Sequence, residues 1–167
     1  MAQTSSQKTL KEVFQDPRDI LAFGFGSGLA PVAPGTFGTV AAIPVYIICS
    51  LFHPKVYLVL TIIAFLLGIY VCGRASKALG VDDHPSIVWD EITGYLLTMF
   101  LVPFHWVWIL TGFALFRLFD IWKPHPIKWV ESRVGGGLGI MLDDVIAAVP
   151  AFFILQILSH LYTPGGG

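Results

Sequence analysis

Charged residues are scarce in this chain of 167 residues. They make up 13% of the sequence, whereas a soluble globular domain carries about 25%. Long stretches contain no Asp, Glu, Lys or Arg at all, namely residues 20–54, 56–73, 92–116 and 145–167. A bilayer rejects unpaired charge and needs about 20 apolar residues per crossing helix. The pattern therefore excludes an ordinary soluble domain and predicts a polytopic membrane protein.

Cysteines and an excess of basic residues are also lacking. The two cysteines, Cys49 and Cys72, lie inside apolar stretches, and we interpret them as packing residues rather than as a disulfide or a metal site. A net charge of −1 offers no basic face of the kind that nucleic acid requires, so we expect no nucleic-acid partner. The expected partners are the membrane bilayer and lipids within it, and the oligomeric state stays open.

The apolar stretches predict an all-α membrane bundle of about four to five helices. The expected helices cover residues 36–52, 56–73, 87–102, 105–121 and 144–161, and the third and fourth form a short hairpin near Pro103. Thr36 or Thr39 is expected to cap the first of them. Residues 74–86 are expected to form a polar loop, and the glycines and prolines of residues 24–35 exclude a continuous helix there.

Basic residues suggest how the chain is divided and oriented. Residues 1–19 are predicted to form a cytoplasmic amphipathic arm, residues 20–163 a single membrane-embedded domain, and residues 164–167 a tail without an assigned role. The positive-inside rule places the arm, the loop with Arg74 and the loop with Lys123 on the cytoplasmic side. An even number of crossings must then separate these segments, which the hairpin at Pro103 satisfies.

Acidic residues gather at the predicted helix ends. Those at or beside a membrane boundary are Asp82, Asp83, Asp90, Glu91, Asp120, Asp143 and Asp144. An ionised carboxylate in a bilayer is costly unless it is paired, and such residues are candidates for function. The predicted topology brings all of them to one membrane face.

Asp90 and Glu91 are the hardest of these residues to explain structurally. They lie about one turn inside a predicted apolar helix, and Gly94 follows one turn later, where a small residue permits close approach. For the others a simpler interpretation stays open. Asp143 and Asp144, expected at a helix start, could serve only as favourable N-terminal charges. Arg117 with Asp120 could be a structural ion pair, and Asp82 and Asp83 could simply be solvated.

Carboxylates converging near basic residues are typical of a hard-cation site that receives a phosphate, and Mg²⁺ prefers such oxygen ligands. We hypothesise that Asp90, Glu91, Asp143 and Asp144 bind Mg²⁺. Asp83 and Asp120 would contribute directly or through water, and His84 could protonate a leaving alkoxide, although a loop histidine without a role is equally compatible with its position.

Phosphate-binding candidates come from two places. Gly35, Thr36 and Thr39 lead into a helix, whose free backbone donors suit an anion, although these glycines could equally provide a tight membrane turn. Arg117 and Lys123 are expected to bind a phosphomonoester, Arg through its planar fork and Lys as a point charge.

Four ordered segments together resemble the phosphatidylglycerophosphatase A family. They are residues 26–39 (GSGLAPVAPGTFGT), 83–91 (DHPSIVWDE), 116–127 (FRLFDIWKPHPI) and 136–144 (GGLGIMLDD). The resemblance implies a magnesium-dependent phosphatase of the bacterial inner membrane. The apolar stretches and the positive-inside rule add the expectation of a multi-pass protein with its active site on the cytoplasmic face. The resemblance also implies the substrate, phosphatidylglycerophosphate, which is hydrolysed to phosphatidylglycerol and phosphate in phospholipid synthesis.

Two other classes of function use the same residues. Intramembrane carboxylates also line the paths of small ion or proton transporters, but here the acids gather on one side rather than at mid-depth. Charges that pair across subunits would indicate a membrane assembly protein. Phosphate release from a lipid monophosphate distinguishes the enzyme from both.

Overall fold

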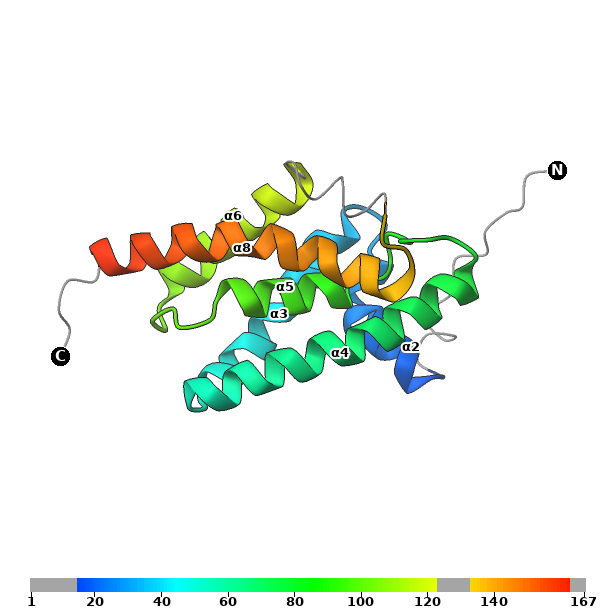
Figure 1. The fold of residues 1–167 in the computed structure, drawn as a ribbon, viewed down its shortest axis with the longest axis horizontal. Coiled ribbons are helices and arrows are strands. Elements are labelled where there is room, and N and C mark those ends of the chain that lie inside the picture. Colours follow the sequence, from blue (N-terminus) through cyan, green and yellow to red (C-terminus); the bar gives the residue numbers. More distant parts are fainter. Residues whose placement is uncertain (1–14, 123–132, 163–167) are drawn as a thin grey trace.

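The computed structural model describes residues 15–122 and 133–162, which fold almost entirely into helices (Figure 1). The predicted all-α fold is confirmed, because these residues form helices and turns and no strand. The elements in chain order are α2 (Pro17–Ala22), the 3₁₀ helix η1 (Gly24–Leu29), α3 (Pro34–Ser50), α4 (Pro54–Leu79), α5 (Trp89–Thr98), α6 (Trp106–Trp122) and α8 (Gly136–Tyr162). Most of the predicted N-terminal arm and the predicted tail lie outside the described residues.

The short helix α5 lies at the centre of the bundle. It has ten residues, nearly all of them buried, and it contacts α3, α4, α6 and α8. Figure 1 shows it between the two long helices, α4 and α8. At about 15 Å it is half as long as a bilayer core is thick, so it cannot cross a membrane alone. The turn that contains Pro103 joins α5 to α6, as the sequence predicts.

The two longest helices, α4 and α8, are long and apolar enough to cross a membrane. They have 26 and 27 residues and mean hydropathies of 2.5 and 2.1. Much of α4 faces outward, and its exposed side chains are apolar: Val56, Leu58, Val59, Leu60, Ile62, Ile63, Leu66, Leu67 and Tyr70. Soluble proteins rarely expose a continuous apolar face of this size, so α4 is suited to lipid surroundings.

The predicted polar loop over residues 74–86 begins too early. Helix α4 continues to Leu79 and ends at Gly80, whose left-handed conformation (φ 69°) closes the helix. Arg74 and Lys77 therefore belong to the last turns of α4. The sequence prediction was wrong here because it ended the helix at the first charged residue, and Arg74 keeps its charge inside the helix by pairing with two aspartates.

Two predicted helix starts are also wrong. α8 begins at Gly136, so Asp143 and Asp144 lie about two turns inside it and are not N-terminal charges. α3 begins at Pro34 after Ala33, whose φ is 48°, and neither Thr36 nor Thr39 caps it. A proline already has the φ that a first helical position needs, which explains the earlier start.

Glycines allow α4 and α8 to cross in close contact. A Cβ on Gly137 would overlap the carbonyl oxygen of Ile69 and lie 2.7 Å from the nitrogen of Gly73. One turn further along α8, the thiol of Cys72 lies 3.9 Å from the sulfur of Met141. Cys49 and Cys72 are free and buried, which agrees with their interpretation as packing residues. The crossing fixes the N-terminal part of α8 against the C-terminal part of α4.

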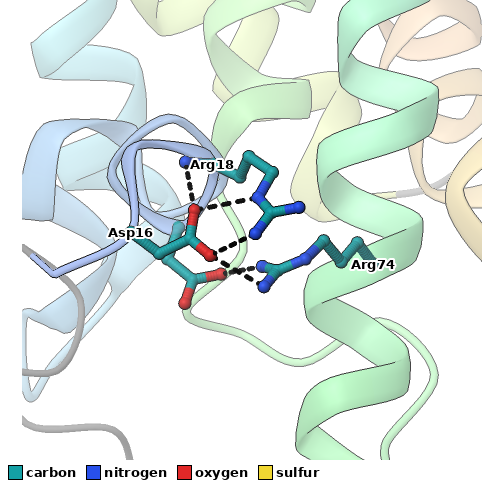
Figure 2. Close-up of polar contacts among 4 residues, drawn as sticks. Asp16, Arg18 and Arg74 are labelled. Carbon is teal, nitrogen blue, oxygen red and sulfur yellow. Dashed lines mark hydrogen bonds and ion pairs between the residues drawn. The ribbon is translucent and has the colours of Figure 1, made fainter.

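An ionic cluster attaches α2 to α4 (Figure 2). Arg18 and Arg74 converge on the carboxylate of Asp16, and Arg74 also donates to Asp19 at 2.8 Å. Hydrogen bonds from Arg18 hold the pKa of Asp16 well below its ordinary value. A lowered carboxyl pKa means that the pairing is complete at neutral pH and is lost only in strong acid. The buried carboxylate of Asp19 makes Arg74 the structurally important member.

The α4–α8 crossing predicts a sharp difference between two neighbouring glycines. Gly137→Ala should destabilise the protein by about 2 kcal/mol, because its Cβ meets backbone atoms that cannot turn away. Gly135→Ala is the matched control, since nothing lies within 4 Å of its Cβ. Thermal unfolding of both variants in detergent checks this, and equal midpoints would contradict the close crossing.

The ionic cluster predicts unequal roles for its two arginines. Arg74→Ala should lower stability by about 2 kcal/mol, because it removes an ionic hydrogen bond from the buried Asp19. Arg18→Ala should change stability little, since Arg18 is exposed and surface ion pairs contribute little. Denaturation of the two variants in the same detergent provides the comparison. A larger loss for Arg18→Ala would assign the anchoring role to Asp16 instead.

Candidate active site

A cavity of about 350 Å³ opens where the starts of α3 and α5 meet the end of α6 and the N-terminal part of α8. Its lining is Ala33, Pro34, Gly35, Asp83, Pro85, Ile87, Asp90, Glu91, Arg117, Asp120, Ile121, Ile140, Asp143 and Asp144. Of the seven acidic residues predicted to share a face, the cavity brings together all but Asp82. Residues more than 60 positions apart in the sequence thus line one space.

Three of the carboxylates that line this cavity lie close together. Asp90, Glu91 and Asp144 are 6%, 9% and 4% exposed. Each offers one oxygen, and these three oxygens lie within 4.8 Å of one another. This cluster contains three of the four predicted metal ligands. Asp143 lines the cavity but is outside the cluster.

Each carboxylate of the cluster has an oxygen without a hydrogen bond. Within the described part of the chain, no donor reaches Asp90 Oδ1, Glu91 Oε2 or Asp144 Oδ2, although all are buried. Buried carboxylates repel one another and are costly unless a cation or a donor satisfies them. A divalent cation with a preference for oxygen ligands fits this set of residues. These carboxylates could therefore hold a divalent metal ion.

Gly94 allows the cluster to form from two helices. Its missing side chain leaves room for α8, because a Cβ at this position would lie 3.1 Å from Cβ of Asp144 and 2.7 Å from the ring of Phe116. Asp90 and Glu91 occupy the first turn of α5, one turn before Gly94. The sequence prediction that Gly94 permits close approach next to the acidic pair agrees with this packing.

Arg117 supplies the positive charge of the cavity. Its guanidinium forms a close ion pair with Asp120 on the same helix, and Nη1 lies 3.9 Å from Oε1 of Glu91. Its Nε is buried and has no hydrogen-bond partner among the described residues. Arg117 therefore connects the carboxylate cluster to α6 and retains a donor for another acceptor.

Gly35 brings the start of α3 against this pair. A Cβ at Gly35 would overlap Oε1 of Glu91 and would lie 3.2 Å from both terminal nitrogens of Arg117. The first turn of α3, where the helix dipole is positive, thus lines the same cavity as Arg117. A positive helix end beside a guanidinium is an arrangement that suits an anion such as phosphate.

Two further predicted site residues lie in the loop before α5, and only one of them lines the cavity. Asp83 lines the cavity mouth in a left-handed conformation (φ 54°), which is uncommon for a residue with a side chain. His84 does not line the cavity, and its Nδ1 accepts a hydrogen bond from the backbone of Ser86 at 3.2 Å. Asp83 is therefore better placed than His84 to act on a molecule in the cavity.

Thr36 and Thr39, which were predicted to bind phosphate, lie away from the cavity surface. Thr39 is buried, and its hydroxyl donates to the carbonyl oxygen of Gly35 at 2.9 Å. Thr36 is not among the lining residues. The hydroxyl of Thr39 thus stabilises the backbone of Gly35. Of the predicted phosphate-binding residues Gly35, Thr36 and Thr39, only Gly35 lines the cavity. Lys123 lies outside the described residues.

The apolar residues of the lining could not be identified from the sequence. Ile87 and Ile140 are buried, whereas Ile121 is exposed at the end of α6. Isoleucine is common throughout the predicted helices, so composition and spacing do not distinguish these positions. Their proximity to the carboxylates becomes visible only when α5, α6 and α8 are packed together.

Comparisons with known proteins agree with the motifs. The family model for phosphatidylglycerophosphatase A matches residues 20–159. A phosphatidylglycerophosphatase A of Escherichia coli K12 is 42% identical over 151 residues, which cover 90% of this chain and 88% of that protein. The phosphatidylglycerophosphatase A of Haemophilus influenzae is 46% identical over 147 residues, covering 87% and 90% of the two chains.

A more distant relative has a different description. A protein of Bacteroides thetaiotaomicron, provisionally described as a phosphatidylinositol-3-phosphatase, is 34% identical over 146 residues, covering 83% of this chain and 91% of its own. No solved structure matches the chain significantly. The family model spans all six cavity-lining acidic residues and Arg117, and the chain belongs to the phosphatidylglycerophosphatase A family.

Proposed function

We propose that this protein is a magnesium-dependent phosphatase that hydrolyses phosphatidylglycerophosphate to phosphatidylglycerol and phosphate. The observation that carries the proposal is the cluster of Asp90, Glu91 and Asp144, whose buried oxygens lack partners beside the guanidinium of Arg117. The names of the Escherichia coli and Haemophilus influenzae relatives support the substrate. An acidic cluster next to an anion-binding residue is the arrangement that metal-assisted phosphate chemistry requires.

Asp90, Glu91 and Asp144 would hold the metal, and Asp143 lies in the same cavity as a further oxygen ligand or as a ligand of bound water. Bound Mg²⁺ supplies neutralisation of the phosphate charge and a lower pKa for a coordinated water. The protein's own contribution is to keep three carboxylates converging before the substrate arrives. Preorganisation of this kind removes the cost of assembling the site during the reaction.

Arg117 and the first turn of α3 would bind the phosphoryl group. The unpartnered Nε of Arg117 and its terminal nitrogens can donate to phosphate oxygens, while Asp120 keeps the guanidinium in place. Gly35 lets the backbone of α3 come near the same oxygens. Lys123 would add charge from the segment that follows α6.

Hydrolysis needs a proton acceptor and a proton donor. A water molecule attacks phosphorus, the bond between phosphorus and the terminal glycerol oxygen breaks, and the water proton passes to a carboxylate of the cavity. The departing glycerol oxygen takes up a proton, and Asp83, which lines the cavity, is the candidate to carry it, with His84 as the alternative in the same loop. Direct attack by water is favoured over a phospho-aspartyl intermediate, and isotope exchange from labelled water distinguishes them.

The same helices support a proposed position in the membrane. α4 ends in Arg74 and Lys77 on the side where α5 and α8 begin, which is the side of the cavity. With the positive-inside rule, this supports our proposal that the cavity lies at the cytoplasmic boundary of the bacterial inner membrane and that the chain crosses this membrane several times. The acyl chains of the substrate would stay in the bilayer while the phosphate enters the cavity.

The proposal is tested by phosphate release from two lipids in detergent, with and without Mg²⁺. Phosphatidylglycerophosphate should be hydrolysed only with the metal, and phosphatidylinositol 3-phosphate more slowly. Preference for the inositol lipid would replace the proposed substrate with the one that describes the Bacteroides relative. No release from either lipid would refute the enzyme itself.

The carboxylate cluster predicts that Asp90→Asn and Asp144→Asn each reduce kcat at least about 100-fold, since even residues beside metal ligands often account for 10–100-fold. Asp82→Asn is the matched control, because this aspartate is exposed and does not line the cavity. Steady-state rates at saturating Mg²⁺ provide the measurement. Near-normal rates in either cluster variant would remove that residue from the metal site.

The proposed role of Arg117 predicts that phosphate binding requires the planar shape of its guanidinium as well as its charge. Arg117→Lys keeps the positive charge but loses the planar fork, so kcat/KM should fall about 10- to 100-fold. Arg117→Gln should fall further because the charge is also lost. Arg18→Lys, an exposed arginine in the ionic cluster of Figure 2, is the control and should behave as wild type. Full activity of Arg117→Lys would mean that Arg117 acts on the phosphate only as a charge.

A further inference from the structure

Val88 occupies an unusual position at the start of α5. It is the residue that precedes the first turn of α5, two positions before Asp90, and its side chain is 0% exposed. A valine has no hydrogen-bonding side chain to cap a helix, and Val88 makes no side-chain cap here. Its burial therefore needs an explanation other than capping.

Three glycines from two other elements surround this valine. The three atoms nearest to a Cβ built on Gly38 of α3 all belong to Val88, at 2.6, 3.1 and 3.3 Å. A Cβ on Gly24 of η1 would lie 2.6 Å from Cγ2 of Val88, and one on Gly28 would lie 3.1 Å from the same atom. We call Gly24, Gly28 and Gly38 the glycine socket. Only because each lacks a side chain does Val88 fit among them.

The backbone of Val88 is fixed as well. Its N–H donates to the carbonyl oxygen of Ala22 at 2.9 Å, at the end of α2. α2 is in turn attached to α4 through the contact of Asp19 with Arg74. Val88 thus joins α2, η1 and α3 at the point from which α5 starts.

The socket links both sides of the candidate active site. On α3, Gly38 lies one turn after Gly35, which contacts Glu91 and Arg117. On α5, Val88 lies one turn before Glu91. Tightly packed side chains do not deform continuously, so the contact of Val88 with Gly38 sets the distance between the start of α3 and the carboxylates of α5.

The glycines of residues 24–38 therefore have a use other than direct contact with phosphate. Gly35 lines the cavity, whereas Gly24, Gly28 and Gly38 do not. All three instead touch Val88. We propose that Val88 in its glycine socket is a positioning residue that aligns Asp90 and Glu91 with Asp144 and thereby sets the affinity of the cluster for a divalent cation. This inference rests on the proposed function, because it assumes that the cluster binds a cation.

The test changes the two partners of the contact, Gly38 and Val88, first separately and then together. Gly38→Ala should push Val88 away and weaken cation binding about tenfold, a typical effect of disturbing the support of metal ligands. Val88→Gly should weaken binding similarly by leaving α5 unsupported. The double variant Gly38→Ala with Val88→Gly should bind within about threefold of wild type, because the alanine then occupies the space that Val88 left.

Cation binding is measured directly, with Mn²⁺ as the probe and electron paramagnetic resonance of the full chain in detergent as the readout. Binding in this assay does not depend on turnover. Thermal unfolding without metal is recorded for every variant, so that a loss of affinity can be separated from a loss of folded protein.

Two controls separate positioning from general damage. Gly28→Ala should not be rescued by Val88→Gly, because its Cβ also overlaps the carbonyl oxygen of Ser86. Gly112→Ala would press on Met99 and Leu155, away from the socket, so it should lower the unfolding temperature without changing Mn²⁺ affinity. Gly112 lines no part of the cavity.

The outcomes distinguish the inference from the function on which it rests. If wild type binds Mn²⁺ and Gly38→Ala binds it equally well, the positioning role is refuted while the metal site stands. If the double variant binds no better than Gly38→Ala, the contact between the two residues is not what aligns the cluster. If wild type binds neither Mn²⁺ nor, in competition, Mg²⁺, the proposed metal-dependent function fails and the inference fails with it.

Discussion

The structure depends on keeping three carboxylates buried at one end of an apolar bundle. Asp90, Glu91 and Asp144 are almost inaccessible, and in such surroundings each negative charge raises the cost of the others. Arg117 offsets part of this repulsion, but its guanidinium is already shared with Asp120. Because this repulsion is always present, the packing around the carboxylates must be firm enough that they cannot push it apart. The glycines around the site provide that packing.

The short central helix makes the arrangement possible. α5 starts inside the bundle, so its first turn is covered by α3, α6 and α8 instead of by water or lipid headgroups. A helix long enough to span a bilayer would place its first turn at the membrane surface. Because α5 is only ten residues long, its first turn can be surrounded on all sides while the loop with Asp83 still reaches the cavity mouth. The length and burial of this one helix thus determine where the carboxylate cluster lies.

Sequence reasoning found the residue types of the site and missed several of its supports. Asp90 and Glu91 stood out because an acidic pair has no simple use inside an apolar helix, and the cavity contains both. Asp143 and Asp144 line the cavity, but the sequence prediction misplaced them at a helix start, because α8 begins earlier, at Gly136. In the fold, Gly137 is inside α8 and allows the crossing with α4. A close contact between helices depends on both partners, and one sequence segment does not contain that information.

The balance of charge in the cavity also constrains the order of events. Among the described lining residues there are six carboxyl groups and one guanidinium group. A phosphomonoester carries up to two negative charges and would be repelled from a lining of this composition as long as the carboxylates are ionised and uncompensated. If the cavity has the proposed function, bound cations would reduce this negative charge before a phosphate lies beside Arg117. The position of Arg117 between Glu91 and Asp120 fits this order, because its guanidinium already pairs with these carboxylates and its unpartnered Nε could donate to a phosphate bound later.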